Sequence, residues 1–193
     1  GARAPRLAPA QRGRAGGAKP GTTLVRCGDG WYADNTDGWG LLPDLADNLD
    51  RPLAGCDVLV LGAGGAARGI MGPLLATSPR SVALLNRTAS RAEELAAAFA
   101  QHGPVASMSS AQLDGRKFHV VINATSVGVS RDVSGDIPER LWPASPFAPG
   151  SLAYDLVYSD SATPFLGWAT EQGAARTADG PGMLIEKAAE SFA

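Results

Sequence analysis

A glycine-rich segment at residues 62–67, Gly-Ala-Gly-Gly-Ala-Ala, directly follows the apolar run at residues 58–61. Its spacing fits the Gly-x-Gly-x-x-Gly/Ala fingerprint of dinucleotide sites, with Ala67 in the third small position. In such a turn Gly62 permits a tight bend, and Gly64 lets a pyrophosphate approach amides at a helix N-terminus. The segment therefore predicts dinucleotide binding, against the alternative of an ordinary glycine-rich turn.

The end of the next predicted strand indicates which dinucleotide. An NAD site usually places Asp or Glu there to accept the ribose 2′-hydroxyl. This chain has Asn86-Arg87-Thr88 instead, with Arg91 one helical turn further on. Guanidinium groups bind a 2′-phosphate through charge-assisted hydrogen bonds, so the pattern predicts NADP. The alternative is that both arginines are solvated charges on a surface helix.

The elements that must position these residues follow an alternating pattern typical of an α/β fold. Apolar runs predict strands at residues 23–26, 31–33, 57–61, 81–85, 118–123 and 151–157, the first two joined by an Asp-Gly turn. Helical periodicity predicts helices at residues 39–49, 66–77, 90–101, 163–172 and 183–192. We expect Pro43 to start or kink the first helix, and Gly72-Pro73 to interrupt the second. Ser90 and Glu93 form a capping-box pattern before the third. Alternation of this kind predicts a parallel sheet covered on both faces.

The charge is distributed unevenly along the chain. The net charge of the 193 residues is −2, yet residues 1–21 contain four Arg, one Lys and no acidic residue. The rest of the chain carries 12 basic and 19 acidic residues. Residues 1–21 are mostly Gly, Ala, Arg and Pro without an apolar period, so we expect a disordered or non-native segment, such as a fragment boundary or an out-of-frame translation. The alternatives are a nucleic-acid-binding arm or a transit peptide.

Composition excludes several classes of protein. No apolar run approaches the ~18 residues of a membrane span, and no signal-peptide core is present, which favours a cytoplasmic protein. Two cysteines 29 residues apart, Cys27 and Cys56, fit a reducing compartment and no metal site. His102 and His119 have no triad or metal-ligand pattern around them, so we expect structural roles. The acidic ordered part and scattered tryptophans argue against a nucleic-acid partner.

Several motifs in order along the chain resemble the shikimate dehydrogenase family, including its quinate/shikimate relatives. They are the Asn-Thr-Asp-Gly loop at residues 35–38, the turn at 62–67, Asn86-Arg87-Thr88 with Arg91, Asn-Ala-Thr-Ser-Val-Gly at 123–128, Tyr-Asp-Leu-Val-Tyr at 154–158 with Thr-Pro-Phe-Leu at 163–166, and Asp179-Gly180-x-x-Met-Leu. Single motifs are weak, because glutamyl-tRNA reductase also has a Gly-Ala-Gly turn and an Asn-Arg-Thr segment. The ordered set covers residues 22–193.

The resemblance implies a Rossmann-like doubly wound parallel sheet and an NADP-dependent reduction of 3-dehydroshikimate to shikimate, in chorismate and aromatic amino acid biosynthesis. It assigns cofactor contacts to Gly62, Ala63, Gly64, Gly65, Ala66, Asn86, Arg87, Thr88, Arg91, Thr125, Ser126, Leu156 and Gly180. It makes Asp37 a ligand of the substrate hydroxyl and the partner of a catalytic lysine in proton transfer, and it places Tyr158 against the substrate. By themselves, Asp37 is compatible with a turn or helix cap and Tyr158 with a half-buried strand aromatic.

Three departures from the family pattern bear on substrate and activity. The family lysine lies further upstream of the aspartate than this chain extends, so Lys19 is not its counterpart. We therefore expect the family's substrate domain to be largely missing. Thr22 stands where the family has an asparagine. Lys187 stands where the family has a substrate-binding glutamine, and it is compatible with pairing to a substrate carboxylate or with a surface position.

These considerations divide the chain into a non-native segment at 1–21, a remnant of the substrate domain at 22–34, and an NADP-binding domain at 35–193 with a linker helix and a C-terminal helix. Two functions remain open: an active shikimate dehydrogenase, or a fragment that binds NADP without turnover. A glutamyl-tRNA reductase-like domain is a distant third, since that family lacks the Asn-Thr-Asp-Gly loop. The sequence does not report the oligomeric state.

Overall fold

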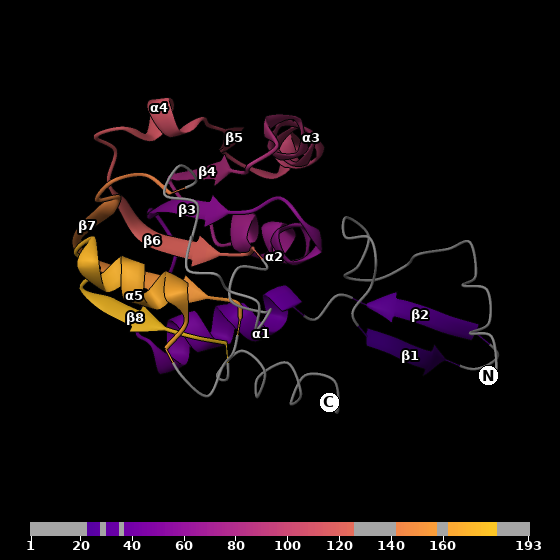
Figure 1. The fold of residues 1–193 in the computed structure, drawn as a ribbon. Helices are drawn as coiled ribbons and strands as arrows, with labels where there is room; N and C mark the ends of the chain where they lie inside the picture. Colours follow the sequence, from indigo (N-terminus) through magenta and orange to yellow (C-terminus); the bar gives the residue numbers. More distant parts are fainter. Residues whose placement is uncertain (1–22, 28–29, 35–36, 126–141, 158–161, 181–193) are drawn as a thin grey trace.

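The computed structural model describes residues 23–27, 30–34, 37–125, 142–157 and 162–180. Within them, a six-stranded sheet has the order β5-β4-β3-β6-β7-β8, and every neighbouring pair is parallel. Figure 1 shows its strands stacked with their arrowheads pointing the same way. The strands are β3 (Asp57–Leu61), β4 (Ser81–Leu85), β5 (Val105–Ser107), β6 (Phe118–Asn123), β7 (Phe147–Asp155) and β8 (Arg176–Ala178). The predicted parallel α/β sheet is confirmed.

Helices cover both faces of this sheet, because residues of alternating strand positions enter two separate cores. Val58 and Val60 pack with α1, α2 and α3, whereas Leu59 and Leu61 pack with α4 and α5. The helices are α1 (Asp37–Pro43), the π-helix η1 (Asp44–Asn48), α2 (Gly65–Ala76), α3 (Ala89–Phe99), the 3-10 helix η2 (Ala100–His102), α4 (Ser110–Leu113) and α5 (Pro164–Glu171). Strands buried on both faces explain the near-continuous apolar runs in the sequence.

A separate antiparallel hairpin precedes the parallel sheet. Strand β1 (Thr23–Cys27) pairs with β2 (Gly30–Asp34), and the register places Thr23 opposite Asp34 and Cys27 opposite Gly30. This register leaves two residues between the strands, as the Asp-Gly signal predicts. The predicted hairpin is confirmed: β1 is one residue longer than predicted at its carboxyl end, and β2 is one residue longer at each end.

The expectations for the two prolines have opposite outcomes: Pro43 stands at a change of helix type, as expected, whereas Pro73 does not interrupt its helix. Pro43 is the last residue of α1, and the chain continues as the π-helix η1, so the helical segment changes type at the proline. The predicted interruption at Gly72-Pro73 is wrong, because α2 runs from Gly65 to Ala76 with Pro73 inside it. Ile70 and Leu74, both fully buried, anchor the helix on either side of the proline. Proline removes one backbone hydrogen bond, and this packing holds the helix together around it.

The predicted capping box at Ser90 is also wrong. Helix α3 begins at Ala89, and its N-cap is Thr88, whose side chain makes no capping hydrogen bond. Ser90 therefore lies inside the first turn. A capping box forms instead at α4, where Ser109 accepts from the backbone N–H of Gln112 and the Gln112 side chain accepts from the backbone of Ser109.

Strand β7 begins earlier than predicted, and three short elements were not predicted at all. Pro149 and Gly150 lie within β7, where the register against β6 shifts between Phe118 and Val120. The extra residues of β7 at this irregularity explain why a proline and a glycine fit inside the strand. Elements β5, α4 and β8 have only three or four residues, too few for a periodic pattern. The predicted helix at residues 183–192 lies outside the described residues.

Candidate functional site

The carboxyl ends of β3 and β6 meet where the strand order reverses, which is where open α/β sheets bind ligands. Gly62 follows β3 with a φ of +105°, a conformation that favours glycine. A Cβ atom at Gly62 would lie 2.8 Å from the carbonyl oxygen of Ala124, which follows β6. The amide of Gly62 donates to Leu85 O at 2.8 Å, and the amide of Ala124 donates to Leu61 O at 2.8 Å. The turn is thus fixed between three strands, and no other residue type fits at its first position.

The next two glycines lie in open space. A Cβ atom added at Gly64 or Gly65 would have no neighbour within 4 Å, and both residues are exposed. Gly64 is the N-cap of the 12-residue helix α2, and neither a capping side chain nor an acidic residue occupies its first turn. Ala66 is exposed, Ala63 is half-buried, and Ala67 is fully buried against the core. No side chain caps the backbone amides at the N-terminus of α2, and no side chain blocks access to them. A pyrophosphate could therefore bind these amides directly.

A second helix N-terminus lies at the carboxyl end of β4. Thr88 caps α3 without a side-chain hydrogen bond, and the first turn holds no acidic residue. Asn86 donates from Nδ2 to the Thr88 carbonyl at 2.9 Å, which shapes the turn. Arg87, Thr88 and Arg91 are exposed. In the part of the chain that the structure describes, neither guanidinium has a hydrogen bond or ion pair.

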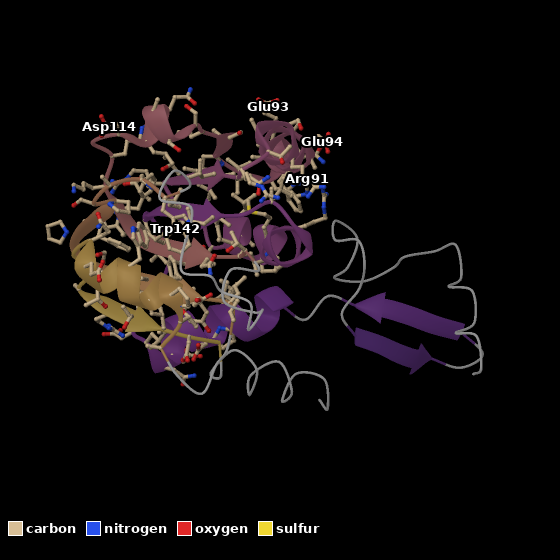
Figure 2. The ribbon with its side chains drawn as sticks, viewed as in Figure 1. Arg91, Glu93, Glu94, Asp114 and Trp142 are labelled. Atoms are coloured by element: carbon tan, nitrogen blue, oxygen red, sulfur yellow. The ribbon has the colours of Figure 1, made fainter. Side chains whose placement is uncertain are left out.

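Two cations beside a helix N-terminus oppose the positive end of the helix dipole, so this arrangement does not serve helix stability. Figure 2 shows Arg91 on the edge of α3 that lies toward α2, whereas Glu93 and Glu94 lie on other edges of the same helix. The Arg91 cation and the two glutamates therefore lie on different sides of α3. The geometry favours a dianion such as a ribose 2′-phosphate over a set of solvated surface charges.

A buried polar network joins the ends of β6 and β7. The Asn123 side chain, fully buried, donates from Nδ2 to Asp155 Oδ1 at 2.8 Å. Its Oδ1 accepts from the Thr125 amide at 3.1 Å and from Thr125 Oγ1 at 2.6 Å. Asp155 also accepts from the Val157 amide at 3.0 Å and from Thr163 Oγ1 at 2.5 Å. The network therefore links the residues that follow both strands to Thr163, the N-cap of α5.

Burial raises the pKa of the Asp155 carboxyl above its ordinary value. The hydrogen bonds from Thr163, Val157 and Asn123 act in the opposite direction, and the nearby Asp179 carboxylate adds to the rise. Asp179 directly precedes Gly180, where an added Cβ would lie 3.0 Å from the carbonyl oxygen of Leu156. Leu156, half-buried, donates its amide to Asn123 O at 3.0 Å. The segments after β7 and β8 thus pack closely beside Asn123.

Comparison with known proteins agrees with this geometry. Residues 44–131 match the model of the family described as shikimate/quinate 5-dehydrogenase. The shikimate dehydrogenase (NADP(+)) of Dechloromonas aromatica is 49% identical over 187 residues, which cover 97% of this chain and 66% of that protein. The shikimate dehydrogenase (NADP(+)) of Thioalkalivibrio sulfidiphilus is 48% identical over 189 residues, which cover 97% of this chain and 67% of that protein. The chain belongs to the shikimate dehydrogenase family.

Solved structures of related proteins share the fold. An Ael1 enzyme from Pseudomonas putida is 40% identical, with a TM-score of 0.76 over 88% of this chain and 60% of that one. A shikimate 5-dehydrogenase from Thermus thermophilus, solved in complex with NADP(H) and shikimate, is 30% identical, with a TM-score of 0.69 over 88% of this chain and 59% of that one. The chain spans about two thirds of the length of the curated relatives that it matches.

The shikimate dehydrogenase assignment confirms the resemblance drawn from the ordered motifs and the Rossmann-like fold, and it argues against the glutamyl-tRNA reductase alternative. The structure brings the predicted cofactor residues of the turn after β3, the α3 N-terminus, Thr125, Leu156 and Gly180 to one edge of the sheet. Asp37 is the first residue of α1, a helix that packs on α2. Thr22, Ser126, Tyr158 and Lys187 lie outside the described residues.

Sequence reasoning missed the buried polar residues of this shikimate dehydrogenase domain. Asn123 and Asp155 each end an apolar run and Thr163 begins a predicted helix, and these positions were the available signal. Asp44 was missed as well, although it is only 4% exposed. Tyr154 Oη donates to Asp44 Oδ2 at 2.6 Å, and Asn48 Nδ2 donates to Asp44 Oδ1 at 2.9 Å. The first bond joins the π-helix η1, directly after α1, to strand β7, and the second lies within η1.

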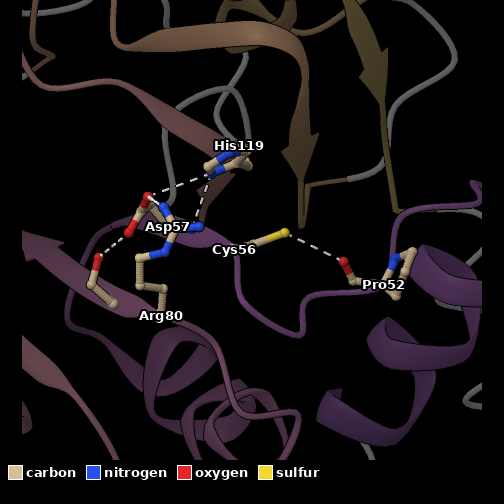
Figure 3. Close-up of polar contacts among 6 residues, drawn as sticks. Pro52, Cys56, Asp57, Arg80 and His119 are labelled. Carbon is tan, nitrogen blue, oxygen red and sulfur yellow. Dashed lines mark hydrogen bonds and ion pairs between the residues drawn. The ribbon is translucent and has the colours of Figure 1, made fainter.

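Figure 3 shows a group of polar contacts at the amino edge of the sheet, which includes Cys56 and His119. Asp57 pairs with Arg80 at 3.0 Å and accepts from Ser81 Oγ at 2.8 Å. Its amide donates to His119 Nδ1 at 3.1 Å, so this imidazole nitrogen is an acceptor. Cys56 Sγ donates to the Pro52 carbonyl at 3.4 Å, and burial raises the pKa of its thiol. Among the described residues, no group of three or more His, Cys, Asp or Glu side chains could hold a metal ion.

No helix in the described ranges is both long and apolar enough to cross a membrane.

Proposed function

We propose that this chain supplies the NADP-binding part of a shikimate dehydrogenase, which interconverts 3-dehydroshikimate and shikimate. The observation that carries the proposal is the pair of uncapped helix N-termini at one edge of the sheet, α2 behind the glycine turn and α3 beside Arg87 and Arg91. Their spacing along the first βαβ unit suits the pyrophosphate and the 2′-phosphate of one dinucleotide. The names of the relatives, which include NADP(+), support the same choice of cofactor.

Each group of the proposed cofactor has residues of matching chemistry. The pyrophosphate lies against the amides at residues 64–66, where Gly64 and Gly65 leave the approach open. The 2′-phosphate lies against Arg87, Arg91 and the Thr88 region. The nicotinamide lies toward Thr125, Leu156 and Gly180, which follow β6, β7 and β8. Ser126, the next residue after Thr125, is a further cofactor contact in this proposal. We infer from the absence of an acidic residue after β4 that NADP is preferred over NAD.

In the proposed reaction, bound NADP supplies the hydride acceptor for C3 of shikimate. Asp37 holds the substrate hydroxyl on that carbon and shares its proton with a lysine, and Tyr158 contacts the substrate. A lysine beside a carboxylate can move this proton at neutral pH once its pKa is lowered. Lys187 and Thr22 are the positions where substrate contacts differ from the family pattern. We propose a cytoplasmic location and a role in the shikimate pathway.

The alternative is a chain that binds NADP without turnover. The observation that favours it is coverage: this chain covers 66% of its Dechloromonas relative. Both functions use the same cofactor site. They differ only in whether the 193-residue chain oxidises shikimate.

A two-part measurement on the 193-residue chain tests the proposal. We expect NADPH titrated against the protein to change the fluorescence of the cofactor with saturation, and NADP to compete. Shikimate oxidation is then followed by NADPH absorbance at high protein concentration. Binding with turnover supports the enzyme, and binding without turnover supports the alternative. Absence of NADP binding contradicts both.

A further inference from the structure

The buried contacts of Asn123 indicate a function beyond sheet stability. Asn123 is the last residue of β6, and every polar atom of its side chain is engaged by a residue at the carboxyl edge. Asparagine oxygen and nitrogen differ in hydrogen bonding, so the contacts fix which way the amide points. Asp155 requires a donor from Asn123, and Thr125 requires an acceptor. The amide can satisfy both neighbours in only one orientation.

This orientation in turn fixes the Thr125 side chain. Thr125 Oγ1 donates its hydrogen to Asn123 Oδ1 at 2.6 Å, so the hydroxyl oxygen can only accept from any further partner. On its other side, the Thr125 methyl group Cγ2 would lie 3.2 Å from a Cβ at Gly62. Thr125 is therefore held beside the first glycine of the cofactor turn, with a hydroxyl of defined polarity.

The same network fixes the neighbouring segment after β7. Leu156 donates its amide to the Asn123 carbonyl, and Val157 donates its amide to Asp155 Oδ1. Gly180 packs against the Leu156 carbonyl so closely that a side chain would not fit without movement. Asp155 also accepts from Thr163, which caps α5 through a hydrogen bond from the Leu166 amide. One buried pair thus holds both segments that face the proposed nicotinamide end.

We propose that Asn123 and Asp155 are positioning residues for the nicotinamide half of the cofactor, acting through Thr125 and Leu156, and that the adenosine half binds independently of them. The inference rests on the proposed function, because it assumes NADP at this edge. It assigns the Thr125 hydroxyl to the bond with Asn123 Oδ1, which holds Thr125 in place beside the glycine turn. Asn123 and Asp155 act through their hydrogen bonds to the segments at Thr125 and Leu156 and not by touching the cofactor, so neither is itself a catalytic residue.

The experiment compares two ligands that share the adenosine end. NADP has both halves, whereas adenosine 2′,5′-bisphosphate has the 2′-phosphate and the adenosine but no nicotinamide. For Asn123→Ala, we expect the affinity for NADP to fall about tenfold and the affinity for the bisphosphate to stay within about twofold of wild type. Arg87→Ala is the matched control, and it should weaken both ligands together. Equal losses of both ligands in Asn123→Ala, or no loss of either, would overturn the proposal.

A second pair of variants separates positioning from general damage to the fold. Asp155→Asn keeps an oxygen that can accept from Asn123 Nδ2 and the Val157 amide, whereas Asp155→Ala removes it. We expect the NADP affinity of Asp155→Asn to stay near wild type and that of Asp155→Ala to fall as in Asn123→Ala. Thr125→Val, which preserves shape and removes the hydroxyl, should show the same selective loss. If Thr125→Val binds NADP as wild type does, the proposed route through the hydroxyl is wrong.

A pH profile gives a readout that a purely structural role would not produce. Asn123→Asp places two carboxyl groups at the 2.8 Å contact, where they cannot both ionise without repulsion. We expect the ratio of NADP affinity to bisphosphate affinity to be low near pH ~8 and to recover toward pH ~6 as the pair shares a proton. Dividing this ratio by the wild-type ratio at the same pH cancels the titration of the ligand phosphates, including the 5′-phosphate monoester that only the bisphosphate carries. A normalised ratio independent of pH contradicts the proposal.

Hydrogen exchange tests the network without any cofactor. In Asn123→Ala, the Thr125 amide loses its acceptor, whereas the Leu156 amide keeps the backbone carbonyl of residue 123. We expect faster exchange at Thr125 than in wild type and a smaller change at Leu156. Failure of the wild-type chain to bind NADP would contradict the proposed function, whereas unchanged exchange at Thr125 would contradict only this inference.

Discussion

The two edges of the parallel sheet treat their polar groups differently. At the amino edge, the Asp57 carboxylate pairs with Arg80 and accepts a hydrogen bond from Ser81. The backbone amide of Asp57 donates to His119, so these polar groups have partners within the chain. At the carboxyl edge, two helix N-termini lack side-chain caps, and Arg87 and Arg91 have no partner within the described ranges. These exposed groups are solvated rather than paired within the chain, so they are available to the proposed cofactor. The polar groups of the amino edge are paired within the fold, and the carboxyl edge carries the proposed site.

The largest expected effect is on stability at the carboxyl edge. Gly62→Ala forces a Cβ to within 2.8 Å of the Ala124 carbonyl at a φ of +105°. We expect a loss of about 3 kcal/mol in the free energy of unfolding, measured by urea denaturation. Gly64→Ala is the matched control, because its backbone has a φ of −86° and its Cβ would meet nothing within 4 Å.

For Gly64→Ala we expect a stability change below about 1 kcal/mol together with weakened NADP binding, because the new methyl group occupies the pyrophosphate approach. Equal destabilisation by the two alanine substitutions would show that the turn is not held against Ala124 as the structure has it.

A smaller effect is expected from the pH dependence of stability. Because burial raises the pKa of Asp155, the folded chain binds its proton more tightly than the unfolded chain does. Stability from this group is therefore present at low pH and is lost as the pH rises through the raised pKa. Asp155→Asn should flatten the unfolding free energy in that range, measured by urea titrations from about pH 4 to about pH 8. A curve as steep as that of wild type would contradict the assignment to Asp155.

The smallest effect is expected at the amino edge. Arg80 pairs with Asp57, but its side chain is 66% exposed, and exposed ion pairs contribute little. We expect Arg80→Ala to lower the unfolding free energy by less than about 1 kcal/mol and to leave NADP affinity unchanged. A clear loss of NADP affinity in Arg80→Ala would remove the distinction between the two edges.

Much of the fold was predictable because strands buried on both faces give strong local signals. Strands β3, β4 and β6 have the predicted bounds, since uninterrupted apolar residues mark them clearly. The failures have local causes. Ser90 fits a capping pattern, but the N-cap of α3 is Thr88, two residues earlier. Pro73 is tolerated because tertiary packing supports α2 around it. Strands β5 and β8 have three residues each, none of them buried, so no run or alternation of apolar residues marks them in the sequence.

The candidate site was predictable where its chemistry is local. The glycine turn and the Arg87 region are short motifs whose positions follow from the adjoining strands. The Asn123 and Asp155 pair is 32 residues apart in sequence, and only the parallel pairing of β6 with β7 brings the two side chains together. The Asp44 and Tyr154 contact spans 110 residues. Such contacts depend on register, which the sequence pattern did not provide.

The most direct test of the contrast between the edges is the affinity of NADP and of NAD for wild type, Arg87→Ala and Arg80→Ala, measured by calorimetry at low salt. We predict that wild type prefers NADP, that Arg87→Ala weakens NADP by about ten- to a hundredfold with little change for NAD, and that Arg80→Ala resembles wild type. Equal affinity of wild type for both cofactors, or equal losses of both in Arg87→Ala, would contradict the assignment of the 2′-phosphate to the N-terminus of α3.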